Sequence, residues 1–506
     1  MFNTFVWQLY KESELGQRAI EHCSSFSNAL HDSVYLTPSF GLPADEMPSN
    51  PSDYPKQELD DVELIQAVQD FAGKTRVESL QQANELFEKL ISCGISVHFS
   101  GEEEAMLLTS ENISANVQHI SIGLHLAHPD YFIPYGFTTS FLDLQRIGEL
   151  FNLALPPVPG KRDMAGRGRY YAQLNGAFHE FRQSYGLSSA EMCAFLHDFA
   201  LQSLLRNEDE LPEPSKVWLV SGGGGNNGDF EWLEDAVKVN ITTYWQGNLE
   251  TRRGDVLLMY CVSPHSRIHS IWRAANDGFV DPFFHYHSTI WIEQPIKTVP
   301  VTFREMKADP LLSQNGYIRA NLQGPSGKPF TVEEYDAVLA IMAKKGQDIS
   351  LLPRPKTVYL LPSTELRNER DVEVNLIEPL LKELGYTDKD WLRQMPLRMG
   401  QGEKFFPDYA FAPQTKRGEE RADMVLEAKF TIPGDKAFRE AYAQAVSYGY
   451  RLQVKVFMLA AREGLWVFGR KQQAFSSERF SFYNWDTLQH PDTLFKLRKS
   501  LVKPRR

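Results

Sequence analysis

Three carboxylates and one lysine in the last third of the chain have the types and spacing that hydrolysis of a phosphate ester needs. Asp408 follows a proline at the start of a strand-like run, and Glu427 and Lys429 stand two residues apart in the next such run. Side chains two apart on a strand project from the same face, so we expect these two to point the same way. Glu373 faces the apolar side of a helix-like stretch, where a carboxylate is costly unless it is paired or binds a metal.

Mg²⁺ prefers hard oxygen ligands and usually binds one or two carboxylates together with water and substrate phosphate. We therefore expect Asp408, Glu427 and Glu373 to hold Mg²⁺, with Mn²⁺ as a substitute. Lys429 would orient the attacking water or stabilise the charge that builds up on the phosphoryl oxygens. Gln444, on the helix-like stretch that follows, would fix the lysine or the water.

Two helices and two strands must position these side chains. The first helix is expected within Asn368–Tyr386, where an apolar stripe recurs at spacings of three and four residues, and Glu369 and Glu373 share its side. The strands are expected at Phe405–Phe411 and Met424–Phe430. The second helix is expected at Ala437–Leu452, with Gln444 on the same face as Ala441, Ala445 and Tyr448.

The order of these parts resembles the PD-(D/E)xK nuclease superfamily, and within it the nuclease domain of type I restriction motor subunits. The matching residues are Glu373, Pro407-Asp408, Glu427-Ala428-Lys429 and Gln444-Ala445-x-x-Tyr448. The resemblance covers about 100 residues and implies an Mg²⁺-dependent endonuclease acting on double-stranded DNA. Asp423 is an alternative to Asp408, although it lies on the same short strand as Glu427. The other alternative is an exposed strand with a Glu-Lys pair on an ordinary α/β domain.

The middle of the chain is expected to be mostly β. The runs VWLVS, DVLLMYCV, IHSIWRA and STIWIEQPI are rich in β-branched and aromatic residues, and TVEEYDAVLAIMAKK closes the segment as a helix. The segment resembles the EVE group of PUA-like small β-barrels at Val217–Gly223, at Thr243–Asn248 and at Arg253-Gly254-Asp255-Val256. That resemblance implies a reader that cages a modified base between aromatic rings.

The residues expected to contact such a base are tryptophans and small polar side chains. The candidate walls are Trp245, Trp218, Trp232 and Trp272, and the candidates for the base edge are Asn248 and Ser221. The alternative for each tryptophan is a place in the core. His265, His269, His285 and His287 gather in the same segment, either as metal ligands or as hydrogen-bonded side chains.

Composition and charge set the limits for the whole chain of 506 residues. The net charge is −12, but residues 351–506 hold 27 basic and 20 acidic side chains, so the excess of positive charge lies where the nuclease is expected. The four cysteines form no CxxC pair, which indicates reduced thiols rather than a disulfide or zinc site. Neither glycine-rich run, SGGGGNNGD or GPSGKP, has the spacing of a phosphate-binding loop, so no ATP is expected. We expect a cytoplasmic protein with no membrane segment.

These features predict a multidomain α+β protein. We expect a helical segment and proline-rich linker at 1–56, a mostly helical domain at 57–210, an EVE/PUA-like β-barrel reader at 211–345, and an α/β PD-(D/E)xK nuclease with a basic tail at 351–506. Pro159–Tyr171 is expected to be a basic loop, which is either solvated or in contact with nucleic acid. In the second case its lysine and arginines would meet the phosphate backbone, and Tyr170 and Tyr171 would stack on a base.

The hypothesis that unites these parts is a modification-dependent restriction endonuclease that reads a modified base, such as a cytosine derivative, and cuts nearby. One alternative is an RNA or DNA-repair nuclease whose middle domain docks nucleic acid. Another is a non-catalytic nucleic-acid-binding protein with a degenerate nuclease fold. A homodimer would suit a domain that cuts one strand, and the sequence shows no interface for it.

Overall fold

The computed structural model is of mixed α/β type and divides into two compact units. Unit 1 comprises Met1–Leu211, Thr243–Glu250 and Asp277–Trp291, and unit 2 comprises Pro212–Thr242, Thr251–Asn276 and Ile292–Arg506. The structure describes residues 1–25, 34–36, 56–58, 62–97, 106–108, 113–135, 141–204, 210–224, 229–239, 241–323, 326–356, 365–399, 403–472 and 474–502. Residues 1–56 and 57–210 thus belong to one unit, whereas the middle segment 211–345 contributes to both.

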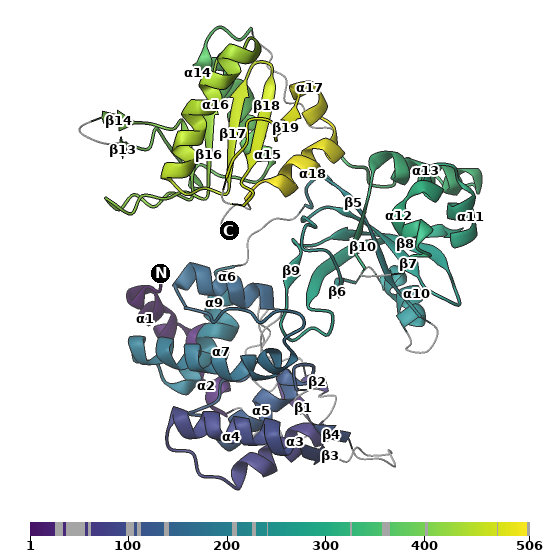
Figure 1. Cartoon of the computed structure of the whole chain (residues 1–506). Helices are drawn as coiled ribbons and strands as arrows, with labels where there is room; N and C mark the ends of the chain where they lie inside the picture. The colour runs from purple at the N-terminus through teal and green to yellow at the C-terminus, as the bar shows by residue number, and fades with distance from the viewer. Residues whose placement is uncertain are drawn as a thin grey trace. The chain divides into compact units, whose positions relative to one another are not determined.

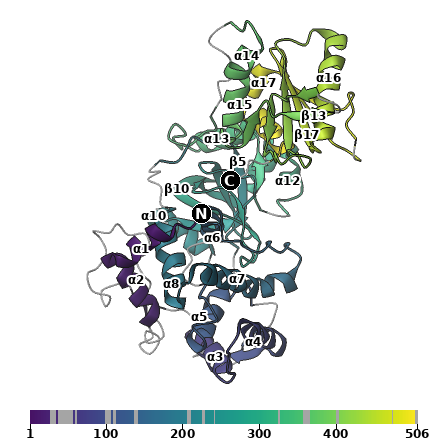
Figure 2. The same ribbon diagram turned by 90° about the vertical axis from the view of Figure 1, so that its left-hand side faces the viewer.

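Helices build most of unit 1. They are α1 (Thr4–Glu12), α2 (Glu14–Ser25), α3 (Val62–Gly73), α4 (Leu80–Cys93), α5 (Val117–Ala127), α6 (Phe141–Phe151), α7 (Met164–Tyr185), α8 (Ser189–Ala194) and α9 (Ala200–Gln202), with a π-helical turn at Phe195–Phe199 between the last two. Two short hairpins, β1 (Val34–Leu36) with β2 (Lys56–Glu58) and β3 (Ile95–Val97) with β4 (Met106–Leu108), accompany them. In both views α3, α4 and α5 lie together at one end of the unit (Figures 1 and 2).

Only residues 159–163 of the segment Pro159–Tyr171 form the expected loop, and the rest is helical. Helix α7 begins at Met164, where the Asp163 side chain accepts a hydrogen bond from the Gly166 N–H as an N-cap. Tyr170 and Tyr171 are fully buried in the core of unit 1. The alternative in which these two tyrosines stack on a base was therefore wrong, because the free energy of burying two large aromatic rings favours a helix at this place.

The middle segment forms a seven-stranded sheet in the order β11-β5-β7-β8-β10-β6, with β9 paired to β10. Its strands are β5 (Val217–Gly222), β6 (Thr243–Gln246), β7 (Val256–Cys261), β8 (Arg267–Ala274), β9 (Phe279–Val280), β10 (Ser288–Thr302) and β11 (Lys328–Phe330). The expected strands at 217, 256, 267 and 288 are thus present. Two irregularities in register between β10 and β8 curl the sheet into a half-barrel.

Short helices follow and flank this sheet in unit 2. They are α10 (Asp229–Val239), α11 (Phe303–Ala308), a 3₁₀ turn at Leu312–Gln314, α12 (Gly316–Arg319) and α13 (Val332–Lys344), the helix expected from TVEEYDAVLAIMAKK. A capping box between Thr331 and Glu334 starts α13.

The last part of unit 2 is a sheet of six strands in the order β12-β15-β16-β17-β18-β19. They are β12 (Trp391–Arg393), β15 (Tyr409–Phe411), β16 (Met424–Ala428), β17 (Val456–Ala461), β18 (Gly464–Gly469) and β19 (Ser481–Tyr483); β13 (Leu397–Met399) and β14 (Glu403–Phe405) form a separate hairpin. β16 and β17 are parallel and are joined by α16 (Gly434–Arg451), whereas the other neighbours are antiparallel.

Both faces of this sheet are covered. Helix α16 packs on one face, where Ala441, Ala445 and Tyr448 meet Val425 and Phe457 (Figure 1). The opposite face carries α14 (Glu369–Val372), a π-helical turn at Glu373–Ile377, α15 (Glu378–Glu383), α17 (Trp485–Leu488) and α18 (Pro491–Ser500). In β16, the side chains of Met424, Leu426 and Ala428 pack on the face opposite α16. The intervening Glu427 therefore points toward the α16 side.

Candidate active site

Asp408 and Glu427 meet at one edge of the six-stranded sheet. The antiparallel register pairs Tyr409 with Leu426, so Asp408 stands opposite Glu427 one residue further along. The Asp408 Oδ2 accepts a hydrogen bond of 2.8 Å from the Ala428 N–H, which fixes the carboxylate against the neighbouring strand. Lys429, two residues after Glu427, donates from Nζ to the Glu427 Oε1 at 2.7 Å. The pair therefore shares a face, as the spacing predicts.

Glu369 and Glu373 reach the same edge from the helix that precedes the sheet. This helix opens into the π-helical turn at Glu373, and such turns are common at functional sites. Arg370 and Arg393 both donate to the Glu373 Oε2 and so compensate part of its charge. One carboxylate oxygen each of Glu369, Glu373 and Asp408 lie within 4.8 Å of one another.

The crowded carboxylates resist ionisation. Burial, followed by the nearby charge of Asp408, raises the pKa of Glu427 to about 7 even though Lys429 opposes the shift. Burial also raises the pKa of Asp408, against the hydrogen bond from Ala428 and the charge of Lys429. Burial would lower the pKa of Lys429, but Glu427, Glu369 and Asp408 together raise it, so this lysine carries its charge at neutral pH.

One atom of this cluster shows what the site could take. The Glu427 Oε2 is fully buried and receives no hydrogen bond from any part of the chain that the structure describes. A buried carboxylate oxygen without a partner costs free energy, and it is a hard ligand of the kind that Mg²⁺ and Mn²⁺ bind. Together with Glu369, Glu373 and Asp408 it could hold a divalent cation, so these residues fit the metal that the sequence predicts.

Gln444 and Tyr448 lie one helical turn apart on α16. The Gln444 Nε2 donates to the Tyr448 hydroxyl at 3.2 Å. Burial raises the pKa of Tyr448, and the charges of Glu427 and Asp408 add to the shift, so the tyrosine faces the acidic cluster. Gln444 itself is exposed. Its position allows it to orient Tyr448, whereas its expected contact with Lys429 or with a water stays a prediction.

A second acidic group in the described part of unit 2 is already neutralised. Glu333, His490 and Asp492 also bring ligand atoms within 4.8 Å of one another. The Asp492 carboxylate, however, pairs with the buried Lys216 and accepts the Val332 N–H at 2.9 Å. Both oxygens of Asp492 are thus taken by donors of the protein, whereas both arginine donors to Glu373 meet its Oε2, so we assign no metal to this second group.

The six residues expected to contact a base are divided between the two units. Trp245 and Asn248 belong to unit 1, whereas Trp218, Trp232, Trp272 and Ser221 belong to unit 2. Trp218 and Trp272 are fully buried, and their indole N–H groups donate to Asp255 and to Ser270 at 2.8 Å each. These two tryptophans therefore belong to the core, as the alternative interpretation had it.

The other four keep partial exposure and have structural contacts. Trp232 lies on α10 and Trp245 on β6, each partly buried. The Asn248 side chain accepts the Glu250 N–H at 2.9 Å, and the Ser221 N–H donates to the Ser326 hydroxyl at the same distance. Neither of the two pockets described below is lined by any of these six side chains.

The histidines of the middle segment are held by the protein. His269 is buried and contacts Ser270, Glu234 and Lys297, while the ring of His287 contacts the Pro159 carbonyl at 2.8 Å. His265 stacks on Phe230 with ring centroids 3.5 Å apart. These contacts agree with hydrogen-bonded or stacked side chains rather than metal ligands.

The Arg253-Gly254-Asp255 run of this segment has a structural role. The buried carboxylate of Asp255 accepts hydrogen bonds from the backbone of Ser215, Lys216 and Arg252, from the Ser215 hydroxyl and from the Trp218 indole. Gly254 has a φ of +88°, and a Cβ there would stand 2.3 Å from the Pro212 carbonyl oxygen. The run therefore builds a turn and does not require contact with a ligand.

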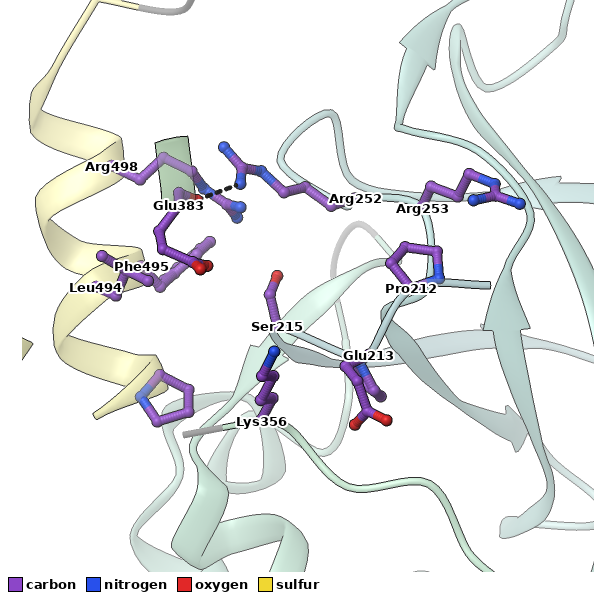
Figure 3. Close-up of a pocket in the computed structure, with 12 residues that line it drawn as sticks. Pro212, Glu213, Ser215, Arg252, Arg253, Lys356, Glu383, Leu494, Phe495 and Arg498 are labelled. Atoms are coloured by element: carbon purple, nitrogen blue, oxygen red, sulfur yellow. Dashed lines mark hydrogen bonds between the residues drawn. The ribbon is translucent and has the colours of Figure 1, made fainter. Parts of the chain in front are cut away.

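A pocket with a basic lining lies within unit 2 (Figure 3). Four cationic side chains line it, Arg252, Arg253, Lys356 and Arg498, against two carboxylates, Glu213 and Glu383. The Arg252 guanidinium donates to the Glu383 carbonyl at 3.1 Å, and the side chains of Lys356 and Ser215 point into the hollow. An excess of positive charge in a concave surface attracts phosphate groups.

Comparisons with known proteins give little beyond these observations. No family model and no curated protein matches the chain. Among solved structures it is similar to Rpa0253 from Rhodopseudomonas palustris, at 20% identity over 27% of this chain and 99% of that one, with a TM-score of 0.22. It is also similar to Atu2648 from Agrobacterium tumefaciens (16% identity, 28% of this chain, 97% of that one, TM-score 0.22) and to a hypothetical protein from Leishmania major (14%, 26%, 97% and 0.22). At these TM-scores the likeness supports no statement on fold or function.

Proposed function

We propose that this protein is a modification-dependent DNA endonuclease that hydrolyses phosphodiester bonds with Mg²⁺ after it reads a modified base, such as a modified cytosine. The observation that carries the proposal is the edge of the six-stranded sheet. There, Asp408 directly precedes β15, and Glu427 and Lys429 lie in and directly after the end of β16. The buried Glu427 Oε2 has no hydrogen-bond donor among the described residues. The order of helix, strand, strand and helix is the one that the resemblance to PD-(D/E)xK nucleases implies.

Each residue has a part that its surroundings support. Asp408, Glu427, Glu373 and Glu369 would hold the cation, which would supply a Lewis acid for the phosphoryl oxygens. Lys429 keeps its positive charge because three carboxylates surround it, so it can stabilise the negative charge that develops during in-line attack of water. The Tyr448 hydroxyl accepts a hydrogen bond from Gln444 on α16 and feels the charges of Glu427 and Asp408.

Two further features support DNA as the substrate. The excess of basic residues lies in 351–506, and the pocket of Figure 3 gathers four of the cationic side chains of unit 2. Contacts between such side chains and phosphates position a duplex without reading its sequence. Among the described residues no helix is both long enough and apolar enough to cross a membrane.

A cleavage assay tests the proposal. The purified protein is incubated with Mg²⁺ and matched duplexes that are unmodified or carry methylcytosine, hydroxymethylcytosine or glucosylated hydroxymethylcytosine. We expect cleavage of one modified duplex, and loss of cleavage in Lys429→Ala. Lys416→Ala is the matched control, since Lys416 is exposed and pairs only with Glu419 among the described residues.

The outcomes separate the parts of the proposal. Equal cleavage of all four duplexes would keep the nuclease and remove the reader. Cleavage of RNA alone would replace the DNA substrate. An absence of any cleavage, together with no binding of Mg²⁺ or Mn²⁺ in a calorimetric titration, would show that the site is catalytically dead.

A further inference from the structure

An aromatic pocket lies within unit 1, apart from the tryptophans that the sequence singled out. Its volume is about 370 Å³, within the range of pockets for small molecules. Three of its walls are Tyr244 on β6, Trp291 on β10 and Phe284 in the turn before β10. The ring of Tyr244 stands edge-on to Phe284 and to Trp291, at centroid distances of 5.6 and 6.0 Å. All three rings are at least partly exposed, and Tyr244 most of all, at 55%.

The turn that carries Phe284 is fixed before any ligand arrives. Arg167, buried on α7, donates from Nε to the Pro282 carbonyl at 2.8 Å and from Nη2 to the Phe284 carbonyl at 2.7 Å. The Asp281 Oδ1 accepts the Phe283 and Phe284 N–H groups at 2.8 and 3.3 Å. The Thr289 hydroxyl donates to the Trp245 carbonyl at 3.0 Å, which holds β6 beside β10. A pocket whose walls are fixed in this way loses little conformational entropy when a ligand binds.

The polar part of the lining indicates what the ligand offers. Asp281 lines the pocket, and the two hydrogen bonds that its carboxylate accepts from described residues both go to Oδ1. Its Oδ2 can therefore accept from an amino group of a ligand, as carboxylates accept from the exocyclic N4 of cytosine. Gln118 and Ser114, also in the lining, supply further groups that can donate and accept.

We propose that this pocket, walled by Tyr244, Phe284 and Trp291, is the site that takes the base, and that it binds a planar nucleobase carrying an exocyclic amino group. The inference rests on the proposed function and moves its reading site from Trp218, Trp232, Trp245 and Trp272 to these three rings. Every base has a π-face that stacks on an aromatic ring, and Asp281 supplies the preference for an amino edge. Aromatic rings also attract ammonium groups, but a pocket of about 370 Å³ is much larger than a methylated ammonium head.

Binding without cleavage tests this site. The probe is a fluorescently labelled duplex with one modified cytosine, titrated in EDTA and followed by anisotropy. Loss of one stacking wall weakens binding roughly tenfold or more, so we expect Tyr244→Ala to raise the Kd by at least that factor. Tyr244→Phe keeps the ring and should bind like the wild type. Phe5→Ala is the matched control, since Phe5 is 69% exposed on α1.

The results distinguish failure of the pocket from failure of the proposed function. If the wild type binds and cuts the modified duplex while Tyr244→Ala binds it equally well, the pocket is not the reading site and the nuclease stands. If the wild type binds no duplex, the proposed function fails. The pocket is then tested separately with free 5-methyldeoxycytidine, which should quench the tryptophan fluorescence of the wild type and not that of Tyr244→Ala. Quenching by choline and not by the nucleoside would overturn the inference that the pocket binds a planar base.

Discussion

Replacing Glu427 by glutamine removes a buried negative charge and leaves the size of the side chain unchanged. In the wild type the Glu427 Oε2 has no hydrogen-bond donor among the described residues and faces the charge of Asp408. In Glu427→Gln an amide NH₂ takes the place of this oxygen and can donate to the Asp408 carboxylate. Glutamine still offers an oxygen to the Lys429 ammonium. We therefore expect the metal-free protein to become more stable and the metal site to be lost.

The magnitude follows from the pKa of Glu427. The pKa of Glu427 rises from 4.5 to about 7 on folding. Ionisation of this carboxyl at pH 8 therefore lowers the free energy of unfolding by about 3 kcal/mol. Because the folded chain holds this proton more tightly than the unfolded chain, the contribution of Glu427 to stability is most favourable below pH 4.5 and is lost as the pH rises through about 7. At pH 5 the ionisation of Glu427 lowers the free energy of unfolding by less than about 1 kcal/mol. For a domain of this size about 3 kcal/mol raises the Tm by roughly 6–12 °C.

Thermal unfolding in EDTA at pH 8 and at pH 5 measures this effect. The control is Glu440→Gln, an exposed glutamate on α16, which should leave the Tm unchanged at both pH values. Addition of Mg²⁺ should raise the Tm of the wild type, since a ligand that binds only the folded state stabilises it, and should have little effect on Glu427→Gln. A variant that is less stable than the wild type at pH 8, or a gain that is the same at both pH values, would refute the reasoning.

Three further predictions concern residues with separate roles. Lys429→Ala should lower the cleavage rate by about 10²–10³-fold with unchanged DNA binding, because it removes charge stabilisation in the transition state, and single-turnover kinetics measures this. Asp255→Ala should lower the free energy of unfolding by about 3 kcal/mol or more, because five buried or half-buried donors lose their acceptor. Urea unfolding followed by tryptophan emission measures this loss. Lys356→Ala and Arg498→Ala should each weaken DNA binding uniformly across sequences and reduce the salt slope of log Kd by about one, and unchanged slopes would remove both from the DNA contact.

The strands and the late helices could be predicted from local patterns because local and long-range forces agree there. β5, β7 and β8 are short runs of β-branched and aromatic residues, and α13 has both its apolar spacing and its capping box in the sequence. Helix α7 shows the opposite case. Its start contains Gly166 and Gly168, which favour a loop locally, while the free energy that stabilises it comes from burying Tyr170 and Tyr171 against distant parts of unit 1.

The acidic site could be predicted for a similar reason, and the aromatic pocket could not. Glu427 and Lys429 are two residues apart on one strand, so strand geometry alone places them together. Glu369 lies one turn before Glu373, and this spacing predicts that both face the same side of the helix. The spacing does not predict that the Glu369 carboxylate lies close to Asp408. Tyr244 and Trp291 are far apart in sequence and approach only because β6 pairs with β10, and no local signal fixes that pairing.

The balance of charges at the sheet edge favours a divalent cation over protonation as the means of compensating the negative charge of the carboxylates there. The carboxylates in contact there are Glu369, Glu373, Glu378, Asp408 and Glu427, and the cationic side chains that face them are Arg370, Arg393 and Lys429. Fully ionised, the group carries an excess of two negative charges, equal and opposite to the charge of Mg²⁺. Both arginines contact Glu373 and Glu378, so among the described residues Lys429 is the cation that compensates Asp408, Glu427 and Glu369. Protonation relieves this excess only below about pH 7, whereas a bound cation relieves it at every pH at which the carboxylates ionise. The Tm of the wild type in Mg²⁺ should therefore vary much less between pH 5 and pH 8 than the Tm in EDTA.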